Sequence, residues 1–156
     1  MQEFATRISD AFVGRTAHLP PHSLNSLSRS NHELAFWECV EADRGFTSEP
    51  CYFRRQRLSR RIHCLAGELF VALIDVRPDS PSFLQWQTFS LSDENGRLLE
   101  FPAGVACGWQ VVSQWGRLRL SSSQSPDPHD QRWLRWNDFS LQLPWPEIPD
   151  EIAENP

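Results

Sequence analysis

The stretch GELFVALIDVR, residues 67–77, has the clearest strand pattern of the chain. Its residues are rich in the β-branched and aromatic types that favour an extended backbone. Successive side chains of a strand point to opposite faces, and here both faces are apolar, with Leu69, Val71 and Leu73 on one and Phe70, Ala72 and Ile74 on the other. Such a strand is covered on both sides. We therefore predict that it lies in the centre of a sheet.

Other short strand patterns lie on both sides of this stretch, separated by many of the 12 prolines and 7 glycines. Turn signals such as Asp93-Glu94-Asn95-Gly96 mark hairpins, because Asn-Gly readily adopts the positive φ of a tight turn. Many short strands predict an all-β sandwich, jelly roll or small barrel. The expected strands are 34–41, 51–58, 62–64, 68–77, 83–91, 98–101, 108–113, 117–121 and 139–143.

Length and composition predict one globular domain, since the chain has 156 residues, 40% of them hydrophobic and 22% charged. We expect an N-terminal arm or loop over 1–33, the barrel over 34–146 and an acidic, proline-rich tail over 147–156. The longest apolar run, Leu69–Ile74, is far too short to span a membrane. The first twenty residues lack the apolar core of a secretion signal. We therefore expect a cytoplasmic protein without membrane contact.

The charged residues exclude several classes of function. The net charge is −5, which does not favour binding to nucleic acid. All 15 basic residues are arginines, so chemistry through a lysine Schiff base and a Walker-type phosphate loop are excluded. The cysteines form no CxxC pair, and no two of the five histidines lie two positions apart. We predict reduced, buried thiols, no metal site and no cofactor.

Five arginines lie within eight residues, at Arg54, Arg55, Arg57, Arg60 and Arg61. If this segment is a strand, Arg54 and Arg60 share one face. Two interpretations remain open. These two side chains point into a binding site and hold a phosphate, or the whole segment is a solvated hairpin that pairs with acidic groups of the tail or of a partner.

A set of motifs from Arg60 to Pro146 occurs in an order and spacing that resemble one known family. The segments that carry the likeness are Gly67–Phe70, Ala72, Asp75, Arg77, Ser80–Phe83, Trp86, Leu91–Asn95, Phe101–Trp109, Ser113, Trp136–Asp138 and Trp145–Pro146. In these segments the chain resembles the dTDP-4-dehydrorhamnose 3,5-epimerases. These are metal-independent cupins that epimerise 4-keto-6-deoxy sugar nucleotides.

The resemblance implies a cupin-type jelly-roll barrel that binds a dTDP-sugar in its mouth and forms a homodimer. It also implies proton abstraction by a histidine held by an aspartate, with a tyrosine returning a proton. In the favoured register this chain has Cys51 and Cys107 in place of two histidines, and Ser125 and Pro126 in place of the tyrosine pair. A competing register places Phe36–Cys39 at the first histidine motif, and it does not restore a histidine either. Asp138 is retained, and Arg60 replaces a substrate-binding lysine.

From these positions we predict Asp138 and Cys51 as catalytic residues and Arg60, Arg54, Cys107 and Trp136 as substrate-binding residues. A cysteine can abstract a proton when a cation activates it; alternatively, the two cysteines only fill the space of a former site.

Three functions remain open: a sugar-nucleotide epimerase or isomerase with an altered or lost acid/base set, a barrel recruited to isomerise or cyclise a non-sugar intermediate, and a non-catalytic binding or scaffold protein. Whether the protein is an enzyme stays open at this point.

Overall fold

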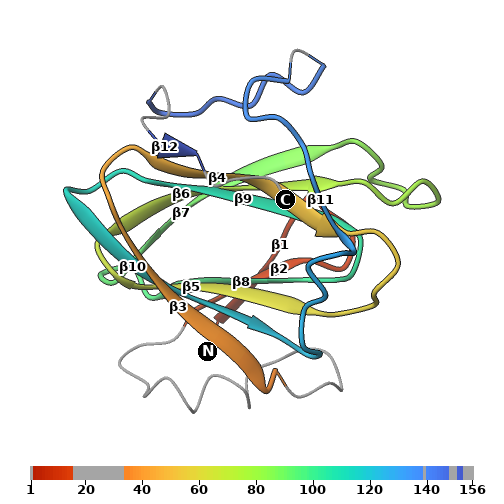
Figure 1. The fold of residues 1–156 in the computed structure, drawn as a ribbon, viewed down its shortest axis with the longest axis horizontal. Coiled ribbons are helices and arrows are strands. Elements are labelled where there is room, and N and C mark those ends of the chain that lie inside the picture. Colours follow the sequence, from red (N-terminus) through yellow and green to blue (C-terminus); the bar gives the residue numbers. More distant parts are fainter. Residues whose placement is uncertain (1, 16–33, 139, 148–150, 153–156) are drawn as a thin grey trace.

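Two antiparallel sheets face each other in the computed structural model, which describes residues 2–15, 34–138, 140–147 and 151–152 (Figure 1). Sheet A has the order β1 (Gln2–Ala5), β2 (Phe12–Arg15), β8 (Arg97–Phe101), β5 (Arg60–Ala66), β10 (Trp115–Ser122) and β3 (Phe36–Asp43). Sheet B has the order β11 (Gln131–Trp133), β4 (Phe46–Phe53), β9 (Val105–Val111), β6 (Glu68–Asp75) and β7 (Trp86–Ser92), and β12 (Glu151–Ile152) pairs with β4 in parallel. The predicted cupin-type jelly roll is confirmed.

The central position predicted for residues 68–77 is also confirmed, since β6 lies between β9 and β7. Leu69, Val71 and Leu73 belong to the main core between the two sheets. The other face of β6, with Ala72 and Ile74, belongs to a second apolar cluster. Residues of the C-terminal segment, Leu134, Leu141, Leu143 and Trp145 among them, cover this face. Both apolar faces of the strand are therefore buried, each by a different part of the chain.

Two strands lie inside the segment that we expected to be arm or loop. β1 and β2 form a hairpin, and β2 continues sheet A by pairing with β8. Phe12 and Val13 of β2 are buried, which explains why a short segment stays extended here. The Pro- and Ser-rich part of the predicted arm, residues 20–31, lies outside the described residues.

The predicted strand at 139–143 is wrong for the described residues 140–143, which contain a turn. Asp138 Oδ1 accepts hydrogen bonds from the backbone N of Ser140 (2.9 Å) and from its hydroxyl (2.7 Å). This side-chain bonding to the following backbone closes a turn in place of a strand ladder.

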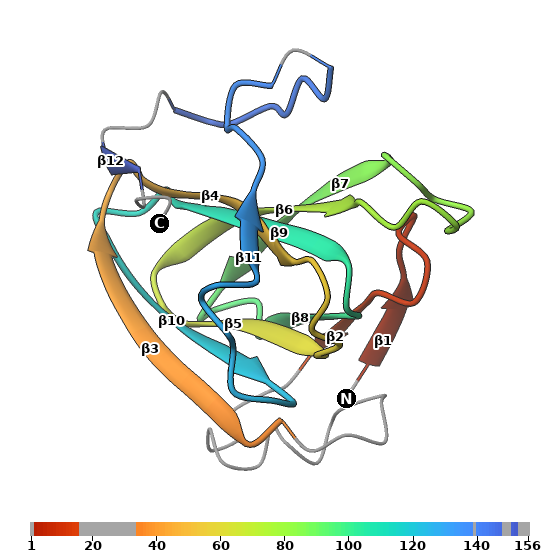
Figure 2. The same cartoon turned by 45° about the vertical axis from the view of Figure 1, so that its right-hand side comes forward.

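The arginine segment 54–57 is not a strand either. The Asp130 carboxylate accepts hydrogen bonds from the backbone N of Arg55 (2.9 Å) and of Gln56 (2.7 Å), which bends the chain after β4. The strand resumes only at Arg60. The connection from β10 to β11 then crosses from sheet A to sheet B at the same end of the barrel (Figure 2).

Candidate functional site

A cavity of about 590 Å³ opens at the end of the barrel where this crossing takes place. Both sheets and the crossing segment contribute to its lining. The lining residues come from β3 and the residue before it (Ala35–Glu38), β4 (Cys51, Phe53), β5 (Arg60, Arg61), β8 (Phe101), β10 (Leu120–Ser122), the β10–β11 connection (Ser125, Pro126, Pro128) and β11 (Gln131). The site therefore lies in the barrel mouth.

Arg60 spans the inner end of this cavity from one sheet to the other. It is the first residue of β5 in sheet A, and its Nη2 donates to the carbonyl oxygens of Cys51 (2.9 Å) and Val105 (2.8 Å) in sheet B. Its Nη1 donates to Cys51 Sγ at 3.5 Å. The guanidinium carbon lies 5.2 Å from the ring centroid of Phe53 and 4.8 Å from that of Phe101. Aromatic faces and backbone oxygens thus hold a cation in a fixed position.

A β-bulge in β4 places Cys51 in the mouth. The register with β9 pairs Ser48 with Trp109 and then shifts, so that Cys51 pairs with Cys107. One extra residue reverses the alternation of a strand. Before the bulge, the even-numbered Phe46 faces inward and packs against the core. After the bulge, the odd-numbered Cys51 and Phe53 face the same side of the sheet and line the cavity. Tyr52 instead packs in the cluster on the outer face of sheet B.

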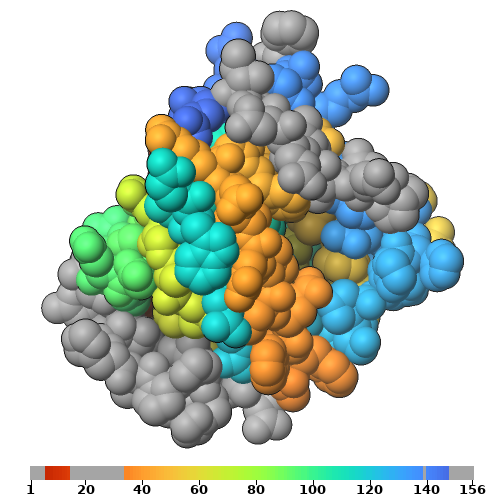
Figure 3. Space-filling view, turned by 60° about the vertical axis from the view of Figure 1, so that its left-hand side comes forward, coloured from red at the N-terminus to blue at the C-terminus, as the bar shows by residue number. Residues whose placement is uncertain are grey.

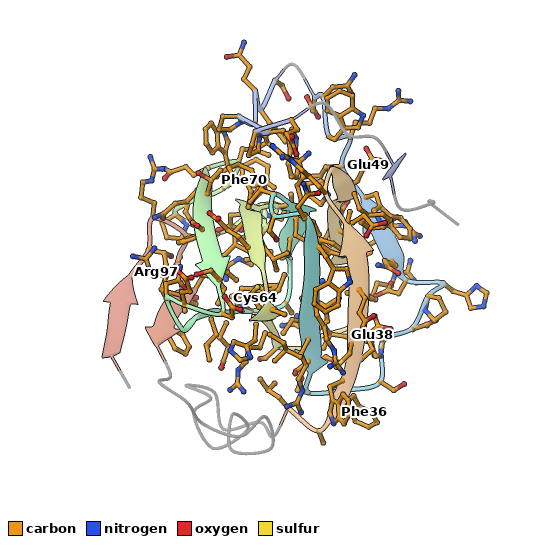
Figure 4. All side chains as sticks on the ribbon, turned by 90° about the vertical axis from the view of Figure 1, so that its left-hand side faces the viewer. Phe36, Glu38, Glu49, Cys64, Phe70 and Arg97 are labelled. Carbon is orange, nitrogen blue, oxygen red and sulfur yellow. The ribbon has the colours of Figure 1, made fainter. Side chains whose placement is uncertain are left out.

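Gly108 and Glu49 hold the bulge in position. A side chain at Gly108 would meet Pro50, with an added Cβ only 2.8 Å from both Pro50 Cγ and Pro50 N. The buried Glu49 accepts a hydrogen bond from the backbone N of Trp136 through Oε2 (2.7 Å). Leu134 N donates to the Pro50 carbonyl oxygen (2.8 Å). Figure 4 labels Glu49 on β4 of sheet B, and Phe36 and Glu38 on β3 and Cys64 on β5 of sheet A.

Cys107 lies beneath the cavity, directly opposite Cys51 on the neighbouring strand, and is only 3% exposed. Burial raises the pKa of its thiol to about 12, although the charge of Arg60 acts in the opposite direction. Cys107 is therefore protonated at neutral pH. Of the two thiols, only that of Cys51 lines the cavity.

The other face of β5 carries a second buried group of charges. Arg61 Nη2 donates to Glu100 Oε2 at 3.1 Å, and both side chains are almost fully buried. Burial lowers the pKa of Arg61, an effect that Glu100 partly offsets. His63 follows on the same face. Burial, and then the charges of Arg61 and Arg119, lower the pKa of His63 to about 4, so His63 is neutral at physiological pH.

The structure brings only part of the predicted site together. Cys51 and Arg60 line the cavity, and Cys107 lies below them. Asp138 and Trp136 instead line a separate hollow of about 350 Å³ in the C-terminal segment. Hydrogen bonds from the Ser140 side chain and backbone lower the pKa of Asp138, but its carboxylate faces solvent rather than Cys51. Asp138 and Cys51, which we predicted as catalytic residues, therefore line different hollows.

Arg54 lies apart from Arg60 as well. The bend after β4 places Arg54 with Arg55, Arg132 and His129 around a third hollow of about 470 Å³, which Asp127 and Asp130 also line. The expectation that Arg54 and Arg60 share one face is wrong, because it required a continuous strand from Arg54 to Arg60, whereas β4 ends at Phe53 and β5 begins at Arg60.

The sequence reasoning missed Phe53, Phe101 and the Val105 carbonyl, which position Arg60. A signal for the bulge was present: a proline interrupts an alternating strand at Pro50, and prolines within sheets occur at bulges or edges. Ser125 and Pro126, which the resemblance placed at the tyrosine positions, do line the cavity.

The family model described as dTDP-4-dehydrorhamnose 3,5-epimerase matches residues 52–155 of this chain. The chain belongs to this epimerase family. Its relatives include the dTDP-4-dehydrorhamnose 3,5-epimerase of Pseudomonas aeruginosa, 35% identical over 95 residues, and that of Salmonella typhimurium, 31% identical over 96 residues. These matches cover 61% and 60% of this chain and 52% of each relative. The chain thus spans about half the length of the curated relatives that it matches.

Solved structures of the epimerase family show the same fold. The dTDP-6-deoxy-D-glucose-3,5-epimerase of Legionella pneumophila, in complex with dTDP-4-keto-L-rhamnose, superposes with a TM-score of 0.86 at 21% identity and covers 99% of this chain and 88% of its own. The dTDP-4-dehydrorhamnose 3,5-epimerase of Bacillus anthracis, with TDP and PPi bound, gives 0.86 at 21% identity over 97% and 94%. At this identity the likeness shows the fold alone.

Few groups that could transfer a proton face the cavity. Among its described lining residues the ionisable side chains are Glu38, Cys51, Arg60 and Arg61, and none is a histidine or a tyrosine. No cluster of three potential metal ligands occurs in the described part of the chain. In the mouth, Arg60 can hold an anion, and the Cys51 thiol lies beside its guanidinium.

A search of the described residues for a helix with the length and hydropathy of a membrane span finds none.

Proposed function

We propose that this protein binds a dTDP-sugar in the barrel mouth through Arg60 and does not carry out epimerisation by an imidazole base. The observation that carries this proposal is the cavity of about 590 Å³ in which Arg60 is fixed between Phe53 and Phe101, with the Cys51 thiol beside it. The resemblance assigns Cys51 to the position of the family's histidine. The solved Legionella relative binds dTDP-4-keto-L-rhamnose, and the Bacillus relative binds TDP and PPi.

Arg60 supports the binding half of the proposal. Its bonds to Cys51 and Val105 use both Nη2 hydrogens and one Nη1 hydrogen. The remaining Nη1 hydrogen and the Nε hydrogen can be donated to a phosphate or a ketone oxygen. Phe36, 47% exposed at the rim, supplies apolar surface on which a base or sugar ring can stack. The ring of the neighbouring Trp37 already packs against the guanidinium of Arg119, at 4.6 Å.

The groups around Cys51 support the second half. Epimerisation beside a ketone needs one group that removes a proton and another that returns it on the opposite face. The Cys107 thiol has a pKa of about 12, Asp138 lies outside the cavity, and Tyr52 packs on the outer face of sheet B. Ser125 and Pro126, which the resemblance assigns to the tyrosine positions, line the cavity. Acid and base groups each contribute about 10²- to 10⁴-fold to such rates, so their loss removes most of the activity.

Calorimetric titration with dTDP and with dTDP-glucose tests the binding. We expect the wild-type protein to bind both, and Arg60→Ala to weaken binding about 10- to 100-fold, because a hydrogen bond to a charged group contributes about 1.5–3 kcal/mol. Arg117→Ala is the matched control, since Arg117 is an exposed arginine on β10 that does not line the cavity. Equal effects of the two substitutions would contradict a role for Arg60. No binding of either ligand would instead favour a recruited barrel for non-sugar compounds or a scaffold.

Isotope exchange tests the chemistry. In deuterated water, dTDP-4-keto-6-deoxyglucose should gain no deuterium beside its ketone above the rate without protein, whereas an active relative such as the Pseudomonas aeruginosa epimerase should introduce it. Protein-dependent exchange would overturn the second half of the proposal. If that exchange were lost in Cys51→Ser, the thiol would be the base.

The predicted homodimer and cytoplasmic location stay predictions. β3 forms one end of sheet A, and Phe36–Cys39 are exposed along it, as Figure 3 shows for the strand drawn in orange. Sedimentation velocity on the purified chain measures the assembly state directly.

A further inference from the structure

Two thiols face each other across neighbouring strands at the inner end of the cavity. The β4–β9 register pairs Cys51 with Cys107, and both cysteines are free. Their positions follow from the bulge, because Cys51 lies three positions after Ser48, which is paired with the core residue Trp109, and simple alternation would turn Cys51 to the outer face of sheet B. The bulge therefore creates a dithiol pair.

The backbone geometry is compatible with a bond between the two sulfurs. Directly opposed residues of antiparallel strands have Cα atoms about 4.5 or 5.5 Å apart, and a disulfide spans about 4.4–6.8 Å. Both spacings fall inside that range. Both side chains also point to the same side of sheet B, because Cys51 lines the cavity and Cys107 belongs to the core beneath it.

The two thiols differ in access, as the two steps of a thiol–disulfide exchange require. Cys51 is partly exposed and lines the open cavity, so an oxidant of low molecular weight can reach it. Arg60 Nη1 donates a hydrogen bond to its sulfur at 3.5 Å. Cys107 is buried and does not line the cavity, but it lies opposite Cys51 on the neighbouring strand.

The remaining cysteines are placed differently. Cys64 is buried four residues further along β5 than Arg60, and its thiol donates to the carbonyl oxygens of Ala66 and Gly67, both at 3.3 Å. Cys39 is exposed on β3, which belongs to sheet A like β5, and its partner in the strand ladder is Arg119 of β10. Neither cysteine lies opposite another in the described strand pairs.

We propose that Cys51 and Cys107 form a redox-active pair that low-molecular-weight disulfides, such as glutathione disulfide, convert to a cross-strand disulfide. The Cys51 thiolate attacks a sulfur of glutathione disulfide, which releases one glutathione thiolate and leaves a mixed disulfide on Cys51. Cys107 loses its proton to solvent and attacks the Cys51 sulfur, which releases the second glutathione. Two electrons pass to the oxidant, two protein thiols become one disulfide, and one glutathione disulfide becomes two glutathione molecules.

Oxidation also changes the cavity. When the Cys51 sulfur bonds to Cys107, it moves toward β9 and its hydrogen bond from Arg60 weakens. The Nη1 group of Arg60 then faces the open mouth. The inference does not depend on which compound the cavity binds, because it concerns only the two sulfurs.

The test uses the purified full chain incubated with glutathione disulfide, followed by thiol titration and peptide mapping by mass spectrometry. We expect the titratable thiols of a Cys39→Ser variant, which removes the exposed cysteine, to fall from three to one. The intact mass should fall by the mass of two hydrogens, and the mapped disulfide should join the peptides of Cys51 and Cys107. Dithiothreitol should reverse the change.

Matched variants separate this pair from the other thiols. Cys39→Ser/Cys64→Ser should still form the disulfide, whereas Cys39→Ser/Cys51→Ser should not. Cys39→Ser/Cys107→Ala should stop at a glutathione adduct on Cys51, and circular dichroism before oxidation confirms that the variants are folded. A stable glutathione adduct on Cys51 with Cys107 still reduced, or a disulfide that involves Cys64, would overturn the proposal.

Discussion

At the scale of single residues, buried ionisable side chains make the stability of the fold depend on pH. Arg61, Glu100 and His63 lie on the face of sheet A that points away from the core, and all are largely removed from water. An ionised side chain in such a place is stable only with a partner. Arg61 has Glu100, whereas the neutral imidazole of His63 avoids the charge altogether.

His63 therefore makes stability depend on pH. Its pKa is about 4 in the folded protein and 6.5 in an ordinary histidine, so between these values the unfolded chain binds a proton that the folded chain does not. Stability falls as the pH drops through this window, by about 3 kcal/mol in full. Urea unfolding at about pH 7 and about pH 4.5 should show a greater loss for the wild type than for His63→Gln. Equal losses would show that other groups dominate.

At the scale of single elements, β4 decides what the cavity contains. The strand that we expected at 51–58 overlaps β4 only at residues 51–53. The side that each residue faces was not predictable, because one bulge reverses the alternation. The expected strand at 139–143 failed for a similar local reason, since Asp138 bonds to Ser140 and closes a turn. Motif order thus predicted the barrel and Arg60 at its mouth, but it did not predict that Asp138 lies elsewhere. A chain position matched to a family does not specify the local hydrogen bonds that place a side chain.

The close contact between Gly108 and Pro50 gives a test of the bulge. Gly108→Ala should destabilise the protein by about 1–3 kcal/mol, because the added methyl would overlap Pro50 and push the bulge away from β9. The displacement should also slow closure of the Cys51–Cys107 disulfide. Chemical denaturation and the thiol titration measure the two effects.

A second substitution isolates the cause. Pro50→Ala removes the Cγ and Cδ atoms that the new methyl meets, so the double variant should recover part of the lost stability. Additive losses in Gly108→Ala and Pro50→Ala would instead mean that the two residues do not interact.

At the scale of the whole molecule, one buried carboxylate joins parts of both sheets. Asp75, at the end of β6 in sheet B, accepts hydrogen bonds from Arg77 (2.9 Å) and from the hydroxyls of Ser80 and Ser82 (2.5 Å each). Arg77 Nη2 also donates to the carbonyl oxygen of Ser9, between β1 and β2 of sheet A (2.7 Å). Burial raises the pKa of Asp75, but these hydrogen bonds outweigh burial and hold it well below its usual range.

Asp75→Asn should therefore cost about 3–5 kcal/mol of folding free energy, because it leaves Arg77 without its buried partner. Asp10→Asn is the matched control, since Asp10 pairs with the same arginine at 3.4 Å but is 74% exposed, and it should cost less than about 1 kcal/mol. Thermal unfolding of the two variants compares them. A similar small loss in both would show that Asp75 does not join the sheets.

The bulge in β4 has a consequence for how such a barrel can diverge. Loss of a single codon from the Glu49–Pro50 pair would remove the extra residue and leave Cys51 two positions after Ser48, still opposite Cys107 and facing inward. The mouth would keep its side chains, while the contacts that Glu49 and Pro50 make with the C-terminal segment would change. A change of chain length by one residue at this point can therefore be absorbed by the bulge without exchanging the residues that line the cavity.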